Sequence, residues 1–425
     1  MRELERRYPD SIAVVGVHSG KYTAERITPR VADASLRLGT THPVLNDRQF
    51  RVWRAFAVQA WPTLVAIDPR GYVVGQHAGE FTADGVAPFV ERVLAEARAA
   101  GSLAPSAHHT VVDAPTTTPS LLAFPGKVAL HGARLAIADS AHHRVLIGAL
   151  DATGHRMRIE RIAGSTSAGF ADGPSAAFDN PQGLAFHGHT LFVADAGNHA
   201  VRAIDLDSGH VRTLAGTGHQ GRTARDLDAG ALSSPWDLTM ADDTLFVAMA
   251  GVHQIWSIDP ATGRAAPHAG SRAEELHDAP LAEAALAQPM GITRAGNLLI
   301  VADAESSAVR TVDLDPAGAV RTLVGTGLFD FGDIDGAGDD ARLQHPQGVA
   351  AASDGRLLVC DSYNDSLRWL DPATRRLSTW VRGLHEPGGV ALGDTAAYVA
   401  DTNAHRVVVV DRTSGEMRPL VIDVP

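Results

Sequence analysis

The sequence predicts an α/β layer domain followed by an all-β propeller of six blades. Two observations predict the propeller. A Pro-x-Gly turn, a short apolar strand and a second apolar run ending in Ala-Asp recur from about residue 124 to the C-terminus. The ends of these second runs follow one another at intervals of 56, 54, 54, 58 and 40 residues, and a period of this size is typical of repeat architectures. A third observation predicts the separate domain, because strands alternate with helices in the first hundred residues.

The predicted α/β domain has short elements with apolar periodicity. In chain order we expect a strand at 12–19, a helix at 27–38 with a stop at Gly39, a strand at 42–47, a helical segment at 48–58, a strand–turn–strand pair at 61–81 and a last helix at 83–100.

This order of elements resembles the thioredoxin fold, and the resemblance implies a cis-proline loop at Trp61 and Pro62. Thioredoxin-like domains carry a Cys-x-x-Cys at the start of the helix after a central strand. The first residues here resemble only the tail of that helix, and the single cysteine of the chain is Cys360. We therefore expect a thioredoxin-like domain without its first strands and its redox pair, with unpaired backbone groups beside the gap. An upstream extension of about 40–70 residues encoding a Cys-x-x-Cys is a further expectation, sized from a small α/β domain.

A linker is predicted where the composition becomes rich in Pro, Ser and Thr, over Gly101–Ser120, with one short strand at Thr110–Asp113. The expected domains are residues 1–104, a linker at 105–122 and the propeller at 123–425.

The propeller follows from the strands within one repeat. Around the second repeat, turn residues separate four strand candidates: Leu184–Phe186, Leu191–Ala194, Ala200–Asp205 and Val211–Leu214. Four short strands per repeat, without a helix of useful length, give a blade, and six repeats give six blades. The inner strands are expected to begin near Lys127, Gly183, Asp237, Gly291, Gly348 and Gly389.

An aspartate closes the second strand in five of the six repeats, and Met249 takes its place in the third. A strand-end Asp accepts backbone N–H bonds in Asx-type caps, and a single active site has little use for five copies. We therefore interpret these residues, called the marks below, as structural: Asp139, Asp195, Asp303, Asp361 and Asp401.

The segments "VADAGNHAVRAIDLDSG" and "VADTNAHRVVVVDRTSG" resemble NHL repeats. The stretches between blades, with a Gly-rich start, an Asp-Gly and a Pro-Gln-Gly exit, resemble the subgroup of NHL proteins that joins a thioredoxin-like domain to the propeller. The resemblance covers about three quarters of the chain. It implies the fold and leaves the activity open, since one fold hosts many functions.

Two patterns were weighed as metal sites. The fourth residue after each mark is often histidine, but equivalent turns lie far apart around a propeller, whereas zinc needs its ligands within about 2 Å. The acidic stretch Asp333–Asp340 lacks the spacing and the final Glu of a calcium loop, so a solvated turn is favoured and a weak calcium site stays open. No metal or cofactor is therefore expected. The residues four after the marks are His143, His199, His253, Ser307, Asp365 and His405.

The Pro-x-Gly turns are the candidate binding site, because they surround the predicted channel mouth without repeating the same side chains. They are expected to bind a protein or a small ligand, while simple packing of the channel remains the alternative. Zinc-dependent NHL-like lyases place His in these turns, lactonase-type propellers need Glu, Asn and Asp there, and neither pattern is present. The candidate residues are Lys127, Gln182, Trp236, Asp237, Met290 and Gln347.

Charge and hydropathy narrow the range of possible partners. Residues 1–100 hold 13 basic and 11 acidic side chains, whereas the remainder holds 24 basic and 38 acidic. Such an acidic propeller argues against nucleic acid. No apolar run reaches the ~18 residues of a membrane span, and one free cysteine suits the cytoplasm. We therefore expect a non-catalytic interaction module. The alternative is a thiol–disulfide oxidoreductase whose Cys-x-x-Cys lies upstream, and a calcium-dependent hydrolase is least favoured.

Overall fold

The computed structural model describes residues 1–103 and 120–424, and the chain divides into two compact units, Met1–Thr118 and Pro119–Pro425. The division falls inside the segment predicted as a linker, whose expected strand at Thr110–Asp113 lies outside the described residues. Within those residues, no helix is long and apolar enough to cross a bilayer.

The N-terminal unit contains the strands and helices expected from the sequence, in the expected order. Thr28 and Pro29 open the second helix, and the chain leaves it through Gly39, whose φ of 59° suits glycine. The elements are α1 (Arg2–Arg7), β1 (Gly16–His18), η1 (Ala24–Arg26), α2 (Thr28–Arg37), β2 (Val44–Asn46), α3 (Arg51–Ala55), β3 (Thr63–Ile67), β4 (Val73–Ala78) and α4 (Ala83–Ala99).

The strands of this unit form two separate two-stranded sheets among the described residues. β1 pairs with β2 in parallel, and β3 pairs with β4 as an antiparallel hairpin. Two such narrow sheets cover few side chains, so Val15, Ile67 and Tyr72 remain 63%, 52% and 65% exposed. A single thioredoxin-like sheet is therefore not formed by residues 1–103.

The loop before β3 is held against the end of β1. The Trp61–Pro62 peptide bond is cis, and the indole Nε1 of Trp61 donates to the carbonyl of Ser19 at 2.7 Å. The Trp61 ring also packs against Trp53, with ring centroids 4.5 Å apart. These contacts place the cis-proline loop beside the carboxyl end of the parallel strand pair.

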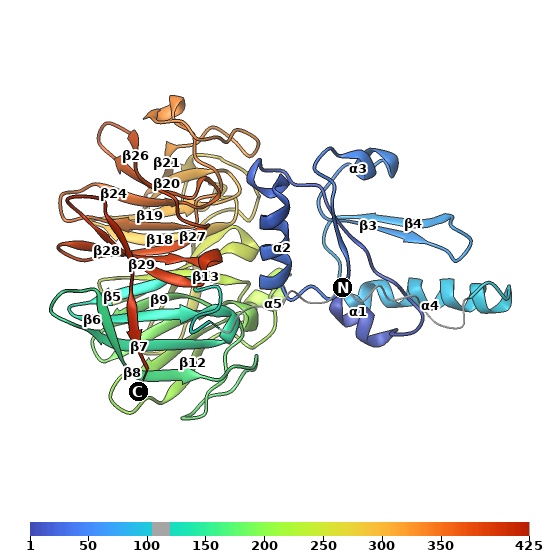
Figure 1. The fold of residues 1–425 in the computed structure, drawn as a ribbon, viewed down its shortest axis with the longest axis horizontal. Coiled ribbons are helices and arrows are strands. Elements are labelled where there is room, and N and C mark those ends of the chain that lie inside the picture. Colours follow the sequence, from blue (N-terminus) through green and yellow to red (C-terminus); the bar gives the residue numbers. More distant parts are fainter. Residues whose placement is uncertain (104–119, 425) are drawn as a thin grey trace. The chain divides into compact units, whose positions relative to one another are not determined.

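The second unit is a six-bladed β-propeller in which each blade is an antiparallel sheet of four consecutive strands (Figure 1). Blades 4 and 5 gain a two-residue outer strand from the preceding connection, β17 (Ala279–Pro280) and β22 (Gly336–Ala337). The strands, from the inner to the outer one, are as follows. Blade 1 has β5 (Val128–His131), β6 (Arg134–Asp139), β7 (Arg144–Leu150) and β8 (Arg156–Gly164); blade 2 has β9 (Pro181–His187), β10 (Thr190–Asp195), β11 (Ala200–Asp205) and β12 (Val211–Ala215); blade 3 has β13 (Pro235–Ala241), β14 (Thr244–Met249), β15 (Gln254–Ile258) and β16 (Ala265–Ala269); blade 4 has β18 (Pro289–Ala295), β19 (Leu298–Asp303), β20 (Ala308–Asp313) and β21 (Ala319–Val324); blade 5 has β23 (Gly348–Ala351), β24 (Leu357–Asp361), β25 (Ser366–Asp371) and β26 (Arg376–Arg382); blade 6 has β27 (Pro387–Leu392), β28 (Ala396–Asp401), β29 (Arg406–Asp411) and β30 (Met417–Pro419).

The apolar side chains that alternate along the strands pack between neighbouring blades. A cluster of buried apolar side chains lies between each pair of neighbouring blades, including one between blades 6 and 1. The last strand, β31 (Val421–Asp423), pairs in parallel with β8 of blade 1. Figure 1 shows this red C-terminal strand beside the green strands of blade 1. The ring is therefore closed both by packing and by a shared sheet.

The antiparallel order gives the propeller two different faces. The inner strands begin on one side, which we call the proline face because it carries the six turns Pro125, Pro181, Pro235, Pro289, Pro346 and Pro387. The second strands return to this face, so the marks lie there too. The hairpins that join first to second strands lie on the opposite side, which we call the hairpin face. The connection between blades 2 and 3 adds a short helix, α5 (Ala224–Asp228), with a capping box at Thr223.

Candidate functional site

Each mark holds the start of its own blade. One carboxylate oxygen accepts the backbone N–H of a residue shortly before the inner strand, and all five carboxylates are fully buried. A buried carboxylate that satisfies a buried N–H has a structural task. The donors and distances are Ala123 to Asp139 (2.6 Å), Asp179 to Asp195 (2.8 Å), Ala287 to Asp303 (2.7 Å), Gln344 to Asp361 (2.7 Å) and His385 to Asp401 (2.5 Å).

In blades 2, 4 and 5 the other oxygen of the mark pairs with an arginine seven residues later, which the sequence interpretation missed. The Asp195–Arg202, Asp303–Arg310 and Asp361–Arg368 distances are 2.8, 3.3 and 2.8 Å, and all six side chains are fully buried. Each guanidinium also binds an acidic residue of the preceding connection: Asp172, Asp278 and Asp335. The sequence signal for this ion pair is an arginine that recurs at the third position of the third strand in blades 2, 4 and 5.

The ionisation of these carboxylates follows from their surroundings. Burial raises the pKa of Asp195 to about 6 and that of Asp361 to about 7, against the hydrogen bonds and the arginine charge that lower it. Burial alone would also raise the pKa of Asp172, but hydrogen bonds from Thr213 and Arg202 outweigh it and lower the value. The ionised outer aspartate therefore helps to balance the buried guanidinium.

Blade 3 lacks both members of this ion pair. Met249 replaces the aspartate, Trp256 replaces the arginine, and both belong to the same buried apolar cluster between blades 2 and 3. The indole Nε1 of Trp256 donates to Oε1 of Gln254 at 3.0 Å, so its polar group is satisfied. The loss of both charges together avoids a buried, uncompensated ion.

The fourth residue after each mark joins its blade to the next one. Its side chain accepts the backbone N–H of the residue before the next Pro-x-Gly turn, and six such bonds run around the ring. These bonds explain why His, Ser and Asp alternate at this position, since each offers an acceptor. The acceptors and donors are His143 and Asn180 (3.1 Å), His199 and Ser234 (3.0 Å), His253 and Gln288 (3.2 Å), Ser307 and His345 (3.2 Å), Asp365 and Glu386 (3.0 Å), and His405 and Phe124 (3.2 Å).

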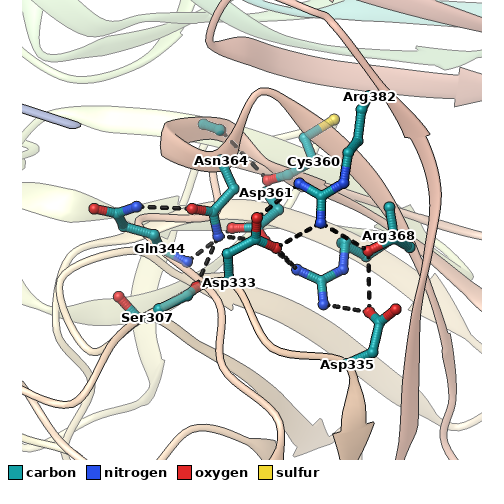
Figure 2. Close-up of polar contacts among 12 residues, drawn as sticks. Ser307, Asp333, Asp335, Gln344, Cys360, Asp361, Asn364, Arg368 and Arg382 are labelled. Carbon is teal, nitrogen blue, oxygen red and sulfur yellow. Dashed lines mark hydrogen bonds and ion pairs between the residues drawn. The ribbon is translucent and has the colours of Figure 1, made fainter. Parts of the chain in front are cut away.

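The acidic stretch before blade 5 is engaged by arginines. Figure 2 shows Asp333 and Asp335 around the guanidinium of Arg368, with Arg382 bound to Asp333 from the side. These carboxylates are half-exposed, yet they are ion-paired and not simply solvated. Over residues 1–103 and 120–424, no three His, Cys, Asp or Glu side chains come together in a metal-binding arrangement.

The predicted channel mouth is closed by an ion pair on the axis. Nζ of Lys127 in blade 1 reaches the carbonyls of Met290 and Gln347 in blades 4 and 5, and it lies 3.5 Å from Oδ2 of Asp237 in blade 3. The same carboxylate oxygen accepts the N–H of Ile292 at 3.2 Å. Burial raises the pKa of Asp237, and the charge of Lys127 opposes the rise.

Glycines allow the inner strands around this ion pair to approach one another closely. A Cβ at Gly183 would lie 2.5 Å from Cα of Asp237, and a Cβ at Gly389 would lie 2.6 Å from the Lys127 side chain. The inner strands therefore approach too closely for side chains at these positions. Blades 1 and 3 have Lys127 and Asp237 at the position where the other four blades have glycine. The structure brings these two side chains together.

The other predicted mouth residues differ in accessibility. Gln182 is buried and donates to Oδ1 of Asn180, and the Met290 side chain is only 9% exposed. Trp236 and Gln347 are half-buried and remain reachable from solvent on the proline face. Of the six predicted residues, these two therefore keep accessible side chains.

The single thiol is next to this closed ring. Cys360 is fully buried in β24, and burial raises its pKa to about 12, with the charge of Lys127 opposing the rise. The group is therefore held as a neutral thiol.

Known proteins resemble this chain over nearly its whole length. The profile of the NHL repeat matches residues 343–370, which include the inner strands of blade 5. NHL repeat-containing protein 2 from Gallus gallus is 36% identical over 470 residues, which cover 97% of this chain and 63% of that protein. The Homo sapiens protein of the same name is 35% identical, with 97% and 64% covered.

A plant protein is similar to the same extent. Protein SUPPRESSOR OF QUENCHING 1, chloroplastic, from Arabidopsis thaliana is 36% identical over 452 residues, which cover 97% of this chain and 42% of that protein. The chain thus spans less than two thirds of the length of these relatives. With the six closed blades and their repeated contacts, these similarities identify the chain as an NHL-repeat protein with a six-bladed β-propeller.

Proposed function

We propose that this chain is a non-catalytic interaction module whose propeller binds a protein partner on the proline face. The N-terminal unit is proposed to be a thioredoxin-like domain without a redox pair, acting in the cytoplasm. The observation that carries the proposal is the half-buried Trp236, whose side chain remains accessible beside the closed axis. A closed ring offers a surface and not a hole, which suits a protein more than a small ligand.

Apolar side chains of the long connections extend this surface. Phe170, Phe329 and Ile334 belong to the connections that lead onto the proline face, and they are 43%, 72% and 52% exposed. Exposed aromatic groups of this kind mark interaction surfaces more often than a lone exposed leucine does. They differ from blade to blade, so they give the six similar blades an asymmetric surface.

The repeated polar side chains are already hydrogen-bonded or ion-paired within the propeller. The marks bind backbone N–H groups, and their arginines bind the connections between blades. The one thiol is buried with a high pKa, which speaks against a role in disulfide exchange. These engagements support a binding role over a catalytic one.

The proposal is tested by quantitative capture of partners from a cell extract with three variants. Trp236→Ala should lose the proteins that the unmodified chain retains. An aromatic side chain that the bound partner buries contributes about 2 kcal/mol or more at a hot spot. Trp380→Ala, a half-buried aromatic on the outer strand of blade 5, is the matched control and should retain them. Equal retention by both variants would contradict the proposal.

A further inference from the structure

A cleft of about 710 Å³ lies on the hairpin face. Its walls come from the hairpins that end the inner strands of blades 4, 5 and 6. The lining includes Leu298, Leu357 and Leu392 as apolar walls. The volume falls in the range of small-molecule sites, which is about 300–1,000 Å³.

Two arginines line this cleft, Arg294 from the end of β18 and Arg412 from the turn after β29. Nη1 of Arg412 is fixed by the carbonyls of Gly393 and Asp394 at 2.8 and 3.3 Å. Nε of Arg294 donates to the carbonyl of Gly296 at 3.0 Å. These bonds hold both guanidinium groups in place through one edge.

Each guanidinium keeps donors for a ligand. Among the described residues, nothing bonds to Nη2 of Arg294 or of Arg412. Nη1 of Arg294 lies 2.9 Å from the carboxylate of Asp242, but that side chain is 79% exposed, and such a surface pair is weak. Each arginine therefore keeps Nη2 available for an anion, and no buried bond has to break first.

The side chains that line the cleft have a different charge balance from the domain as a whole, although Asp242 beside Arg294 and Asp354 near Arg412 lie just outside the lining. Residues 101–425 hold 24 basic and 38 acidic side chains, whereas the lining holds two arginines and one acidic residue, Asp394. Positive groups over apolar walls favour a molecule with an anionic end and an apolar body. The closed ring of Lys127 and Asp237 lies at the other end of the inner strands, so the cleft is distinct from the proline face.

We propose that the hairpin-face cleft binds a small organic anion, with its carboxylate or phosphate group on Arg294 and Arg412 and its apolar body on the leucines. The site does not depend on the proposed partner surface. A loss of partner binding and a loss of anion binding are therefore separate results.

The test is calorimetric titration of the full chain with 4-phenylbutyrate and with phenyl phosphate. The uncharged 4-phenylbutanamide has the same apolar body and serves as the ligand control. We expect one anion per chain, bound at least about tenfold more tightly than the amide, since charge-assisted bonds carry the difference. Either anion binding in this way supports the proposal, and the two together show which head group is preferred.

Variants locate the site. Arg294→Gln and Arg412→Gln should each weaken the bound anion about tenfold. Arg376→Gln, an exposed arginine on the outer strand of blade 5, should leave it unchanged. Ser353→Trp, on the exposed rim, should block the cleft while the melting temperature stays that of the unmodified chain, and Trp236→Ala should bind like the unmodified chain.

Three results would overturn the proposal. They are equal binding of the amide and the anions, anion binding that neither arginine variant nor Ser353→Trp reduces, and no detectable binding of either anion at millimolar concentration.

Discussion

Nζ of Lys127 lies 3.5 Å from Oδ2 of Asp237, and this one contact joins blade 1 to blade 3 at the axis of the propeller. The same ammonium group also donates to carbonyls of blades 4 and 5. Four blades are thus tied by one side chain that is 5% exposed. The pair stands where the other four blades have glycine.

Loss of one partner of this pair should cost more than loss of both charges. Lys127→Met leaves Asp237 buried and uncompensated, and breaking a buried pair in this way costs about 3–5 kcal/mol of unfolding free energy. Lys127→Met with Asp237→Asn should be more stable than Lys127→Met alone, because no charge then remains unpaired. Urea unfolding of the two variants measures the difference. An equal or greater loss in the double variant would show that the charge of Asp237 is not what the lysine compensates.

The bond that His199 makes from blade 2 to blade 3 should make the ring sensitive to acid. Burial and the charge of Arg222 lower the pKa of His199, whose Nδ1 accepts the N–H of Ser234. A histidine whose pKa is lowered in the folded state contributes stability that is fully present above its unfolded pKa of about 6.5. This stability is lost as the pH falls from that value through the lower pKa of the folded state.

Ser307 accepts the same bond in blade 4 without titrating, so His199→Ser is the matched variant. Its melting temperature should fall less than that of the unmodified chain between about pH 7.5 and 5, because the serine takes up no proton in this range. Parallel falls in both proteins would show that His199 does not contribute to the acid sensitivity.

The thiol of Cys360 should react slowly in the native protein. It is fully buried and its pKa is raised to about 12, so little thiolate is present at neutral pH. A bulky aromatic disulfide reagent should label the chain at a measurable rate only after denaturation. Fast labelling without denaturant, or reduction of insulin disulfides by the protein, would contradict both the burial and the non-catalytic proposal.

Much of the propeller was predictable because its information is local. Alternating apolar residues, turn residues and, in five of the six repeats, one Asp lie within one continuous segment such as 181–215, and each blade folds from one such segment. The four strands predicted around the second repeat correspond to β9–β12. The N-terminal strands were also predictable one by one, whereas their division into two sheets depends on contacts between distant segments.

The contacts that build the candidate site were not predictable in the same way. Lys127 and Asp237 both stood out as departures from glycine, but they are 110 positions apart and meet only when the ring closes. The recurring histidines are visible in the sequence, but their partners are backbone groups of the next blade. A backbone partner carries no residue type, so the sequence offers no signal for it.

In the proposed function, repeated residues hold the ring while accessible, unrepeated residues on the proline face bind the partner. The melting temperatures of Asp401→Ala and Trp236→Ala test this division most directly. Asp401→Ala leaves the N–H of His385 and the guanidinium of Arg406 without their carboxylate, which should cost about 1–3 kcal/mol. Asp207→Ala, whose side chain is 74% exposed, is the control for removing a carboxylate. We expect a clearly lower melting temperature for Asp401→Ala alone, with Trp236→Ala and Asp207→Ala close to the unmodified chain. A Trp236→Ala protein that melts as low as Asp401→Ala would contradict it, because Trp236 would then be part of the packing of the channel and not of a binding surface.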